Sequence, residues 1–232
     1  ARMGRMTIQY DLHSHSLASD GTLSPADLVR AAAAAGVDVL ALTDHDSVDG
    51  LNEAREIANE AGLRLVPGVE ISVTWQAQTL HVLGLGVDPA NPLLRQGLDQ
   101  LMAFRDWRAT EIGARLARAG IDGALAGARQ LAQGRIVSRT HFARFLVEQG
   151  YARNVREVFK RYLVNNKPGY VSGQWAALED VLGWIRAAGG VAVLAHPARY
   201  GMSASKLRRC IGAFRECGGQ GMEVVSGSHT AD

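Results

Sequence analysis

The chain has 232 residues, of which 47% are hydrophobic, 21% are charged and 6% are aromatic, a composition typical of a globular protein. This profile excludes an intrinsically disordered or collagen-like chain. The apolar runs, such as residues 31–35 and 191–195, are far shorter than the roughly 20 residues needed to cross a bilayer. The ARMGRM start has no apolar stretch behind it, so we expect a cytoplasmic protein without a secretory signal.

The formal net charge of +2 is unevenly distributed along the chain. Residues 105–167 carry eleven Arg and two Lys against five acidic residues, a net charge of +8, and the rest of the chain carries −6. A basic segment between acidic flanks predicts a cationic region that receives an anion beside a site rich in carboxylates. For any single arginine, a solvated helix surface is the alternative interpretation.

The first part of the chain alternates predicted strands with helices. Strands are predicted at residues 8–12, 39–43, 72–74 and 79–84, and a further strand follows Gly62 and ends at Val69. Helices are predicted at residues 25–36 and 51–61. Ser24 and Pro25 supply an N-cap and a first-turn proline, while Gly36 and Gly62 end the two helices. This alternation predicts an α/β fold built on parallel strands, with functional groups gathered at the carboxyl ends of the strands.

Residues 91–168 show helical periodicity and no predicted strand. Helices are predicted at residues 94–119, 124–133, 139–149 and 155–163. Because this stretch contains most of the basic segment, we expect a helical, substrate-binding insertion. The domain prediction is therefore an N-terminal barrel part over 1–90, the insertion over 91–168 and a C-terminal barrel part over 169–232. Helices at 178–188 and 204–217 and strands at 191–195 and 222–225 are predicted in the last part.

Histidines and carboxylates follow the predicted strands. His13 and His15 lie two apart on an extended segment, so their imidazoles face one side and can reach one metal ion. The further candidate ligands are Asp20, His45, Glu70, His81 and His196. Considered alone, His81 could be a hydrogen-bonded histidine of the core, and Glu70 could be a surface charge at a strand end. Because five of the seven histidines share the pattern, we predict a site for more than one metal ion.

Mixed histidine and carboxylate ligands without cysteine suit Mn²⁺, Fe²⁺ or Zn²⁺. We expect Mn²⁺, two or three ions, with Zn²⁺, Fe²⁺ and Mg²⁺ as alternatives. A carboxylate such as Glu70 can bridge two ions. Closely spaced metal ions lower the pKa of a bound water and stabilise the attacking and leaving oxygens of a hydrolytic reaction, so the pattern predicts a hydrolase.

The segments DLHSHSLASDG and LTDHD resemble the first two motifs of the PHP (polymerase and histidinol phosphatase) family. The resemblance implies a distorted (β/α)7 barrel with a trinuclear metal site. It assigns His13, His15 and Glu70 to one ion, Asp20 and His45 to a second, and Glu70, His81 and His196 to a third. It also implies that Asp44 supports the site. As catalytic residues of the hydrolytic step we expect His196 or Asp20, either of which would orient the nucleophile or the leaving group.

Four later segments resemble those family members that are 3′,5′-nucleoside bisphosphate phosphatases, some of which trim RNA from its 5′ end. The segments are SRTH from Ser138, GYVSGQWA from Gly169, AHPARY from Ala195 and GQGMEVVSGSH from Gly219. The closing Asp-x-His motif of the family is not found, since neither His229 nor Asp232 fits it. The resemblance therefore implies a barrel that lacks its C-terminal segment and two metal ligands.

The basic insertion supplies candidate substrate-binding residues. Arg105 and Arg108 lie three apart on one helical face, where both can reach one phosphate. Ser138, Arg139 and His141 cluster at a predicted helix N-terminus, which favours an anion. The predicted substrate-binding set is Arg105, Arg108, Ser138, Arg139, His141 and Arg199. A surface arginine pair and a simple N-cap are the alternatives.

The primary hypothesis is a metal-dependent phosphoesterase that hydrolyses nucleoside 3′,5′-bisphosphates and, in addition, degrades short RNA in the 5′-to-3′ direction. One alternative is a histidinol-phosphate phosphatase, although a small cationic substrate gains little from a basic region. The other is a nucleic-acid-binding module with a degenerate metal site, whose RNA binding would be sensitive to salt. We expect neither membrane association nor an obligate protein partner.

Overall fold

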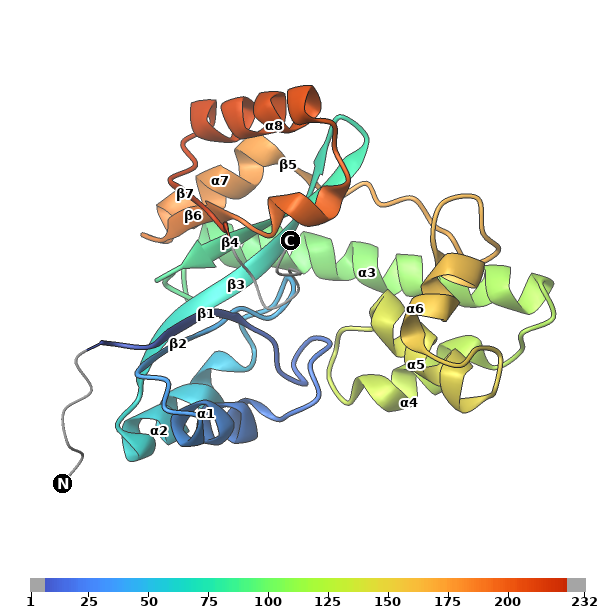
Figure 1. Ribbon diagram of the computed structural model, residues 1–232, viewed down its shortest axis with the longest axis horizontal. Coiled ribbons are helices and arrows are strands. Elements are labelled where there is room, and N and C mark those ends of the chain that lie inside the picture. The colour runs from blue at the N-terminus through green and yellow to red at the C-terminus, as the bar shows by residue number, and fades with distance from the viewer. Residues whose placement is uncertain (1–6, 225–232) are drawn as a thin grey trace.

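The computed structural model describes residues 7–224 and is built around one mixed, seven-stranded sheet (Figure 1). The strands are β1 (Tyr10–Ser14), β2 (Val39–Leu42), β3 (Arg64–Trp75), β4 (Gln78–Leu85), β5 (Ala176–Ala177), β6 (Val191–Leu194) and β7 (Gly221–Met222). Their order is β1-β2-β3-β4-β6-β7, with β5 pairing to β3 beside this path. The α/β prediction is confirmed.

The sheet is parallel at both ends and antiparallel in its middle. β1, β2 and β3 pair in parallel, β4 runs antiparallel to both β3 and β6, and β6 and β7 are again parallel. Within residues 7–224, β1 pairs only with β2 and β7 only with β6, so the described strands form a curled half-barrel with two open edges. His229 and Asp232, the two positions compared with the closing motif, lie outside the described residues.

The β3 strand corrects one detail of the sequence prediction. We expected a strand ending near Val69 and a separate strand at residues 72–74, but β3 continues unbroken to Trp75 because β4 pairs with it from Gly68 onwards. Gln76 and Ala77, both with positive φ, form the two-residue turn of this hairpin. Glu70 and His81 therefore lie inside strands, opposite Leu83 and Ser72, rather than at strand ends.

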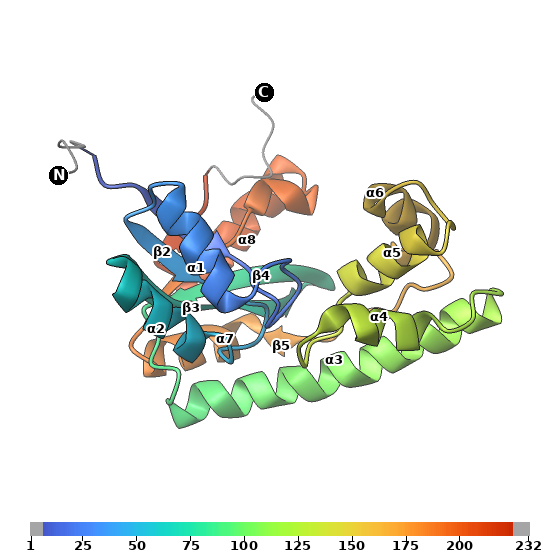
Figure 2. The ribbon, with the colours of Figure 1, turned by 90° about the horizontal axis from the view of Figure 1, so that it is seen from below.

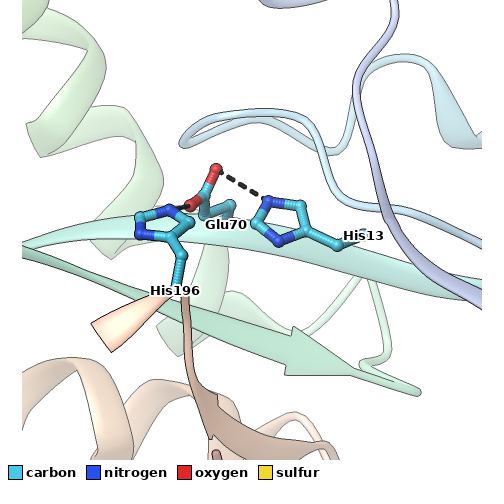
Figure 3. A group of neighbouring side chains, drawn as sticks. All are labelled: His13, Glu70 and His196. Carbon is cyan, nitrogen blue, oxygen red and sulfur yellow. Dashed lines mark hydrogen bonds and ion pairs between the residues drawn. The ribbon is translucent and has the colours of Figure 1, made fainter. Parts of the chain in front are cut away.

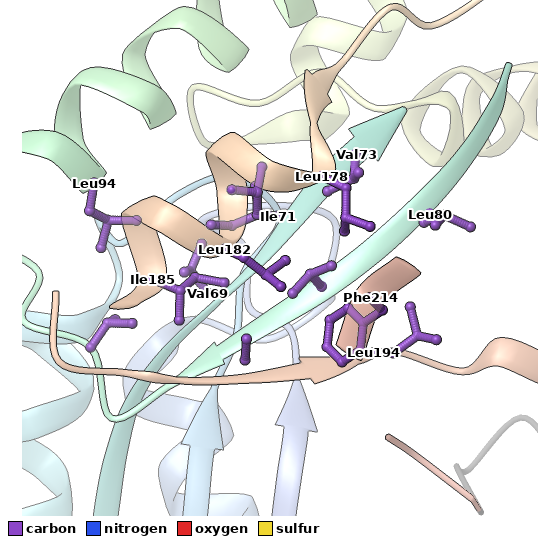
Figure 4. Close-up of a cluster of buried hydrophobic side chains, with 14 of the residues drawn as sticks. Val69, Ile71, Val73, Leu80, Leu94, Leu178, Leu182, Ile185, Leu194 and Phe214 are labelled. Carbon is purple, nitrogen blue, oxygen red and sulfur yellow. The ribbon is translucent and has the colours of Figure 1, made fainter. Parts of the chain in front are cut away.

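Four helices flank the sheet: α1 (Pro25–Ala34), α2 (Leu51–Ala61), α7 (Leu178–Ala187) and α8 (Ala204–Glu216). The predicted caps are present, since the Ser24 side chain accepts from Asp27 N and Gly62 ends α2 with a φ of 66°. Strands β3, β4 and β6 pack against α7 and α8 through buried side chains such as Ile71, Leu182 and Phe214 (Figure 4).

The insertion is helical, as predicted. It contains α3 (Pro92–Arg118), α4 (Ala124–Ala132), α5 (Arg139–Glu148), α6 (Val155–Val158) and a π-helical turn (Phe159–Leu163). The 27-residue α3 runs alongside both the sheet and the insertion (Figure 2). Its Leu94 belongs to the sheet core, whereas its Ile112 and Leu116 pack with Phe142 in a second core. One helix thus takes part in both cores and connects the sheet to the rest of the insertion.

Two shorter features also differ from the sequence prediction. The last strand was expected over residues 222–225, whereas β7 is Gly221–Met222 and Val225 lies outside the described residues. A 3-10 turn, Pro197–Tyr200, follows β6 and was not predicted. Among the helices of the described part, none is long and apolar enough to cross a membrane.

Candidate active site

The structure brings all seven predicted metal ligands together in one cluster. Potential ligand atoms within 4.8 Å of one another form three groups. The groups are His13, Glu70 and His196; His15, Asp20 and His45; and His45, Glu70 and His81. These residues come from β1, β3 and β4 and from the segments that follow β1, β2 and β6. They can meet in one site because the sheet that carries them is curved.

Figure 3 shows Glu70 between His13 and His196. Only 1% of the Glu70 surface is exposed. Five imidazole nitrogens surround its two carboxylate oxygens. The Oε2 atom lies 3.3 Å from His13 Nε2, 3.1 Å from His15 Nε2 and 3.1 Å from His45 Nδ1, while Oε1 lies 3.0 Å from His81 Nδ1 and 2.9 Å from His196 Nε2. Burial raises the pKa of Glu70, but the facing histidines outweigh burial and hold that pKa well below its usual value. Glu70 is therefore a carboxylate.

The ligand atoms fit divalent metal ions. Within residues 7–224, His45 Nδ1 and His196 Nδ1 are buried without a hydrogen-bond partner, although His45 Nδ1 lies beside Glu70. Burial lowers the pKa of His45 to about 3, so its ring is neutral and offers a lone pair. Burial also lowers the pKa of His13, but the carboxylates of Glu223 and Glu70 outweigh this and raise it to about 10. A metal ion bound by the His13 ring would displace the proton from the nitrogen that it contacts.

Asp44 supports the loop that carries His15 and Asp20. Its carboxylate accepts hydrogen bonds from Ser16 N at 2.7 Å, Ser16 Oγ at 2.7 Å and Ser19 Oγ at 2.6 Å. All three residues are buried. This agrees with the supporting role implied for Asp44, because both of its oxygens serve the loop.

Arg105 forms an ion pair that the sequence did not predict. Its Nε donates to Asp46 Oδ2 at 2.7 Å, its second terminal nitrogen (Nη2) lies 2.6 Å from the same oxygen, and that nitrogen also donates to Ser72 Oγ at 3.1 Å. Both partners are buried, and Asp46 adopts a left-handed φ of 48°. Arg105 also lines the large cavity beside the histidines, but the carboxylate of Asp46 already neutralises its charge. Its predicted role as a phosphate ligand stays a prediction.

A cavity of about 1060 Å³ joins the histidine cluster to the insertion. Its wall includes Arg108, Ser138, Arg139, Tyr170, Trp175 and Arg199. The Arg108 guanidinium donates to Val171 O at 3.3 and 3.2 Å and lies 5.4 Å from the centroid of the Trp175 ring. Burial, followed by the nearby charges of Arg139 and Arg105, lowers the pKa of Arg108 to about 9.

Arg139 lies 5.5 Å from the centroid of the Phe159 ring. In the described part of the chain, no carboxylate lies within ion-pair distance of Arg108 or Arg139. Burial also lowers the pKa of Arg139. Two crowded, unpaired guanidinium groups on one cavity wall would be stabilised by an anion.

The start of α5 contacts Asp20, one of the candidate metal ligands. Ser138 caps α5, and its backbone N–H donates to His141 Nδ1 at 3.0 Å, a capping box in which histidine takes the usual place of Glu or Gln. Thr140 Oγ1 and Ser138 Oγ donate to Asp20 Oδ2 at 3.0 and 3.4 Å. Ser138 lines the cavity, whereas the fully buried His141 does not, so the structure places His141 behind the pocket wall.

Comparison with known proteins identifies the fold family. A model described as "PHP domain" matches residues 11–192. The chain belongs to the PHP family. The family prediction made from the DLHSHSLASDG and LTDHD motifs is thereby confirmed.

Two relatives of this PHP chain resemble it over almost its whole length. A 3′,5′-nucleoside bisphosphate phosphatase of Chromobacterium violaceum is 50% identical over 223 residues, which are 96% of this chain and 78% of the relative. A 5′-3′ exoribonuclease of Haemophilus influenzae is 46% identical over 98% of this chain and 82% of its own. A solved structure, an amidohydrolase from C. violaceum with bound sulfate and no metal, superposes with a TM-score of 0.93 and 49% identity, covering 96% and 78% of the two chains.

Sequence reasoning missed three residues that support the PHP site. Asp46 and Glu223 belong to motifs that were noted, but their partners lie 59 and 210 residues away, so no local pattern could reveal the contacts. Tyr200 donates from its hydroxyl to Ala195 O at 2.7 Å and accepts from His81 N at 2.9 Å. It thereby fixes the backbone beside two candidate ligands.

Proposed function

We propose that this PHP chain is a metal-dependent phosphoesterase that hydrolyses nucleoside 3′,5′-bisphosphates. One observation carries the proposal: a histidine and carboxylate cluster suited to divalent metal ions and a pair of unpaired arginines line the same cavity. A substrate with two phosphates needs two anionic positions, one at the metal ions and one at the arginines. The names of the relatives support this choice.

The seven residues His13, His15, Asp20, His45, Glu70, His81 and His196 would hold the metal ions, for which we propose Mn²⁺, with Zn²⁺, Fe²⁺ and Mg²⁺ as alternatives. When bound, such ions polarise phosphoryl oxygens and make a water more acidic. Glu70 would serve as the shared carboxylate, since both of its oxygens face imidazole nitrogens. Asp20 or His196 would hold a proton of the nucleophile or of the leaving group.

Arg108 and Arg139 would bind the second phosphate and orient the nucleotide. Their guanidinium groups are held in place before substrate arrives, Arg108 by Val171 O and Trp175, and Arg139 by the Phe159 ring. Such prior ordering lowers the entropy lost on binding. Ser138 at the start of α5 and Arg199 beside His196 would complete the anion-binding wall.

A second candidate function, 5′-to-3′ degradation of short RNA, is favoured by the size of the cavity. Its volume of about 1060 Å³ slightly exceeds the roughly 300–1,000 Å³ that is usual for small-molecule sites. An oligonucleotide would place its 5′-terminal phosphate and the adjacent phosphodiester at the same two positions. The cytoplasmic location expected from the sequence stays a prediction.

Both rival hypotheses fit the site less well. Histidinol phosphate carries a cation that would face Arg108 and Arg139, to which no described carboxylate is paired. A nucleic-acid-binding module with a degenerate metal site would not need seven ligand residues brought together around a buried Glu70.

The test is a comparison of phosphate release from four substrates by the intact protein with Mn²⁺. The substrates are adenosine 3′,5′-bisphosphate, its 3′- and 5′-monophosphates, and histidinol phosphate. The charge-assisted contacts to the second phosphate predict a kcat/KM for the bisphosphate about 10- to 100-fold above that for either monophosphate. Equal values for all nucleotides, or a preference for histidinol phosphate, would refute the proposal.

A further inference from the structure

Glu223 joins the two open edges of the sheet at the metal cluster. It directly follows β7, and its backbone N–H donates to Leu194 O at 3.0 Å, which extends the β6–β7 pairing. Its side chain then reaches β1 at the opposite end of the strand order, where Oε1 lies 2.8 Å from His13 Nδ1. Its other oxygen, Oε2, accepts from His196 N at 2.7 Å.

The contact with His13 decides which ring nitrogen faces the cluster. A carboxylate accepts hydrogen bonds only, so Nδ1 of His13 must carry a proton where it meets Glu223. The other nitrogen, Nε2, points toward Glu70 at 3.3 Å and toward His15 Nε2 at 3.1 Å. With the proton fixed on Nδ1, the lone pair of Nε2 is left for a metal ion. Such outer partners orient metal-binding histidines and raise their basicity.

The contact with His196 acts on the backbone. His196 has a left-handed φ of 31°, which is costly for a residue with a side chain, and Pro197 after it further restricts this residue. The hydrogen bond from His196 N to Glu223 therefore helps to hold a strained conformation that aims Nε2 at Glu70 Oε1, 2.9 Å away. One carboxylate thus fixes two predicted ligands from different strands.

No other candidate histidine ligand in the described part of the chain has a carboxylate partner of this kind on its outward-facing nitrogen. His15 Nδ1 has only a long contact of 3.5 Å to Ser19 Oγ, and His196 Nδ1 is buried without a hydrogen bond. Among the five clustered histidines of residues 7–224, only His13 pairs its outward-facing nitrogen with a carboxylate.

From this geometry we propose that Glu223 is a positioning residue of the metal centre. It fixes the His13 ring and the His196 backbone so that both present Nε2 toward Glu70, and it does so across the open side of the half-barrel. The inference rests on the proposed metal-dependent function, but its test measures metal binding and ring tautomer, neither of which requires hydrolysis. If the activity assay failed, the metal-binding and tautomer measurements would still decide whether Glu223 positions these ligands.

The first experiment titrates the metal-free intact protein with Zn²⁺ by calorimetry. Glu223→Gln keeps the size of the side chain but offers one acceptor oxygen in place of two, so we expect Zn²⁺ affinity to fall about 10- to 100-fold. Glu216→Gln, the same change at an exposed position on α8, is the matched control and should bind as wild type does. Wild-type affinity in folded Glu223→Gln would overturn the proposal.

The second experiment needs no variant. In the Zn²⁺-loaded wild-type protein, ¹H–¹⁵N NMR of the histidine rings should show His13 protonated at Nδ1 and bound to metal through Nε2. A His13 ring that binds metal through Nδ1, or that lacks the Nδ1 proton, would overturn the proposal even if Glu223→Gln failed to fold.

Discussion

At the scale of single residues, the role proposed for Arg139 allows substrate recognition to be tested separately from the hydrolytic step. Its guanidinium lines the cavity, contacts Phe159 and has no carboxylate partner within residues 7–224. We predict that Arg139→Gln lowers kcat/KM for adenosine 3′,5′-bisphosphate about 10- to 100-fold, through loss of one charge-assisted contact. Activity on a small aryl phosphate, which cannot reach the insertion, should change less than about threefold.

The control for this prediction is Arg129→Gln, which removes the same charge from an exposed position on α4. It should leave both activities close to wild type. An equal loss on both substrates after Arg139→Gln would show that Arg139 serves the fold or the metal centre rather than the second phosphate.

Asp46 and Arg105 give a residue-scale prediction about stability. Removing one partner of a buried ion pair leaves an uncompensated charge, so Asp46→Asn should lower the free energy of unfolding by about 3–5 kcal/mol. Asparagine tolerates the left-handed φ of this position, so the change tests charge rather than backbone strain. Urea denaturation measures the difference.

Asp49 offers the matched comparison, because its ion pair with Arg135 is exposed and 3.7 Å long. Asp49→Asn should cost less than about 1 kcal/mol. Equal costs for the two variants would mean that the buried Arg105–Asp46 pair contributes no more to stability than the exposed Arg135–Asp49 pair.

At the scale of elements, the capping box of α5 makes the insertion sensitive to acid. Burial lowers the pKa of His141 to about 4, against 6.5 for an ordinary histidine, so below pH 6.5 the unfolded chain binds a proton that the folded chain excludes until about pH 4. His141 therefore contributes stability above pH 6.5 that is lost as the pH falls toward 4. The loss amounts to about 3 kcal/mol.

The measurement compares urea unfolding of wild type and His141→Gln between pH 7 and pH 4. Glutamine can accept the same hydrogen bond from Ser138 N and does not titrate. All other titratable groups are common to the two proteins, so the difference between their pH profiles isolates His141. Parallel pH profiles would contradict the assigned role.

Element prediction from the sequence succeeded where a local signal exists. Ser24 and Gly62 mark helix ends through their own hydrogen bonding and backbone freedom, and the helices beside them were placed correctly. The continuity of β3 was not predicted, because it depends on pairing with β4 rather than on its own residues. His141 was predicted as an anion ligand from its place near Ser138, but only the fold shows that it lies behind the pocket wall.

At the scale of the whole molecule, two cores share one site. The sheet carries the histidines and carboxylates, the insertion carries Arg139, and α3 spans both cores while contributing Arg105 and Arg108 to the cavity between them. The clustering of His13, His15, His45 and His196 could be predicted because the carboxyl ends of parallel strands meet at one edge of a sheet, whereas the candidate ligands Glu70 and His81 lie inside strands. Glu223 could not, since its contact with β1 arises only from the curvature of the sheet.

Metal dependence of phosphate release is the measurement that tests the account most directly. The intact protein, treated with a chelator and then dialysed, should release no phosphate from adenosine 3′,5′-bisphosphate, because the seven clustered ligands would have no ion to hold. Adding Mn²⁺ should restore release in a saturable manner. Full activity that persists after chelation, or no activity at any Mn²⁺ concentration, would contradict the proposed metal-dependent phosphoesterase.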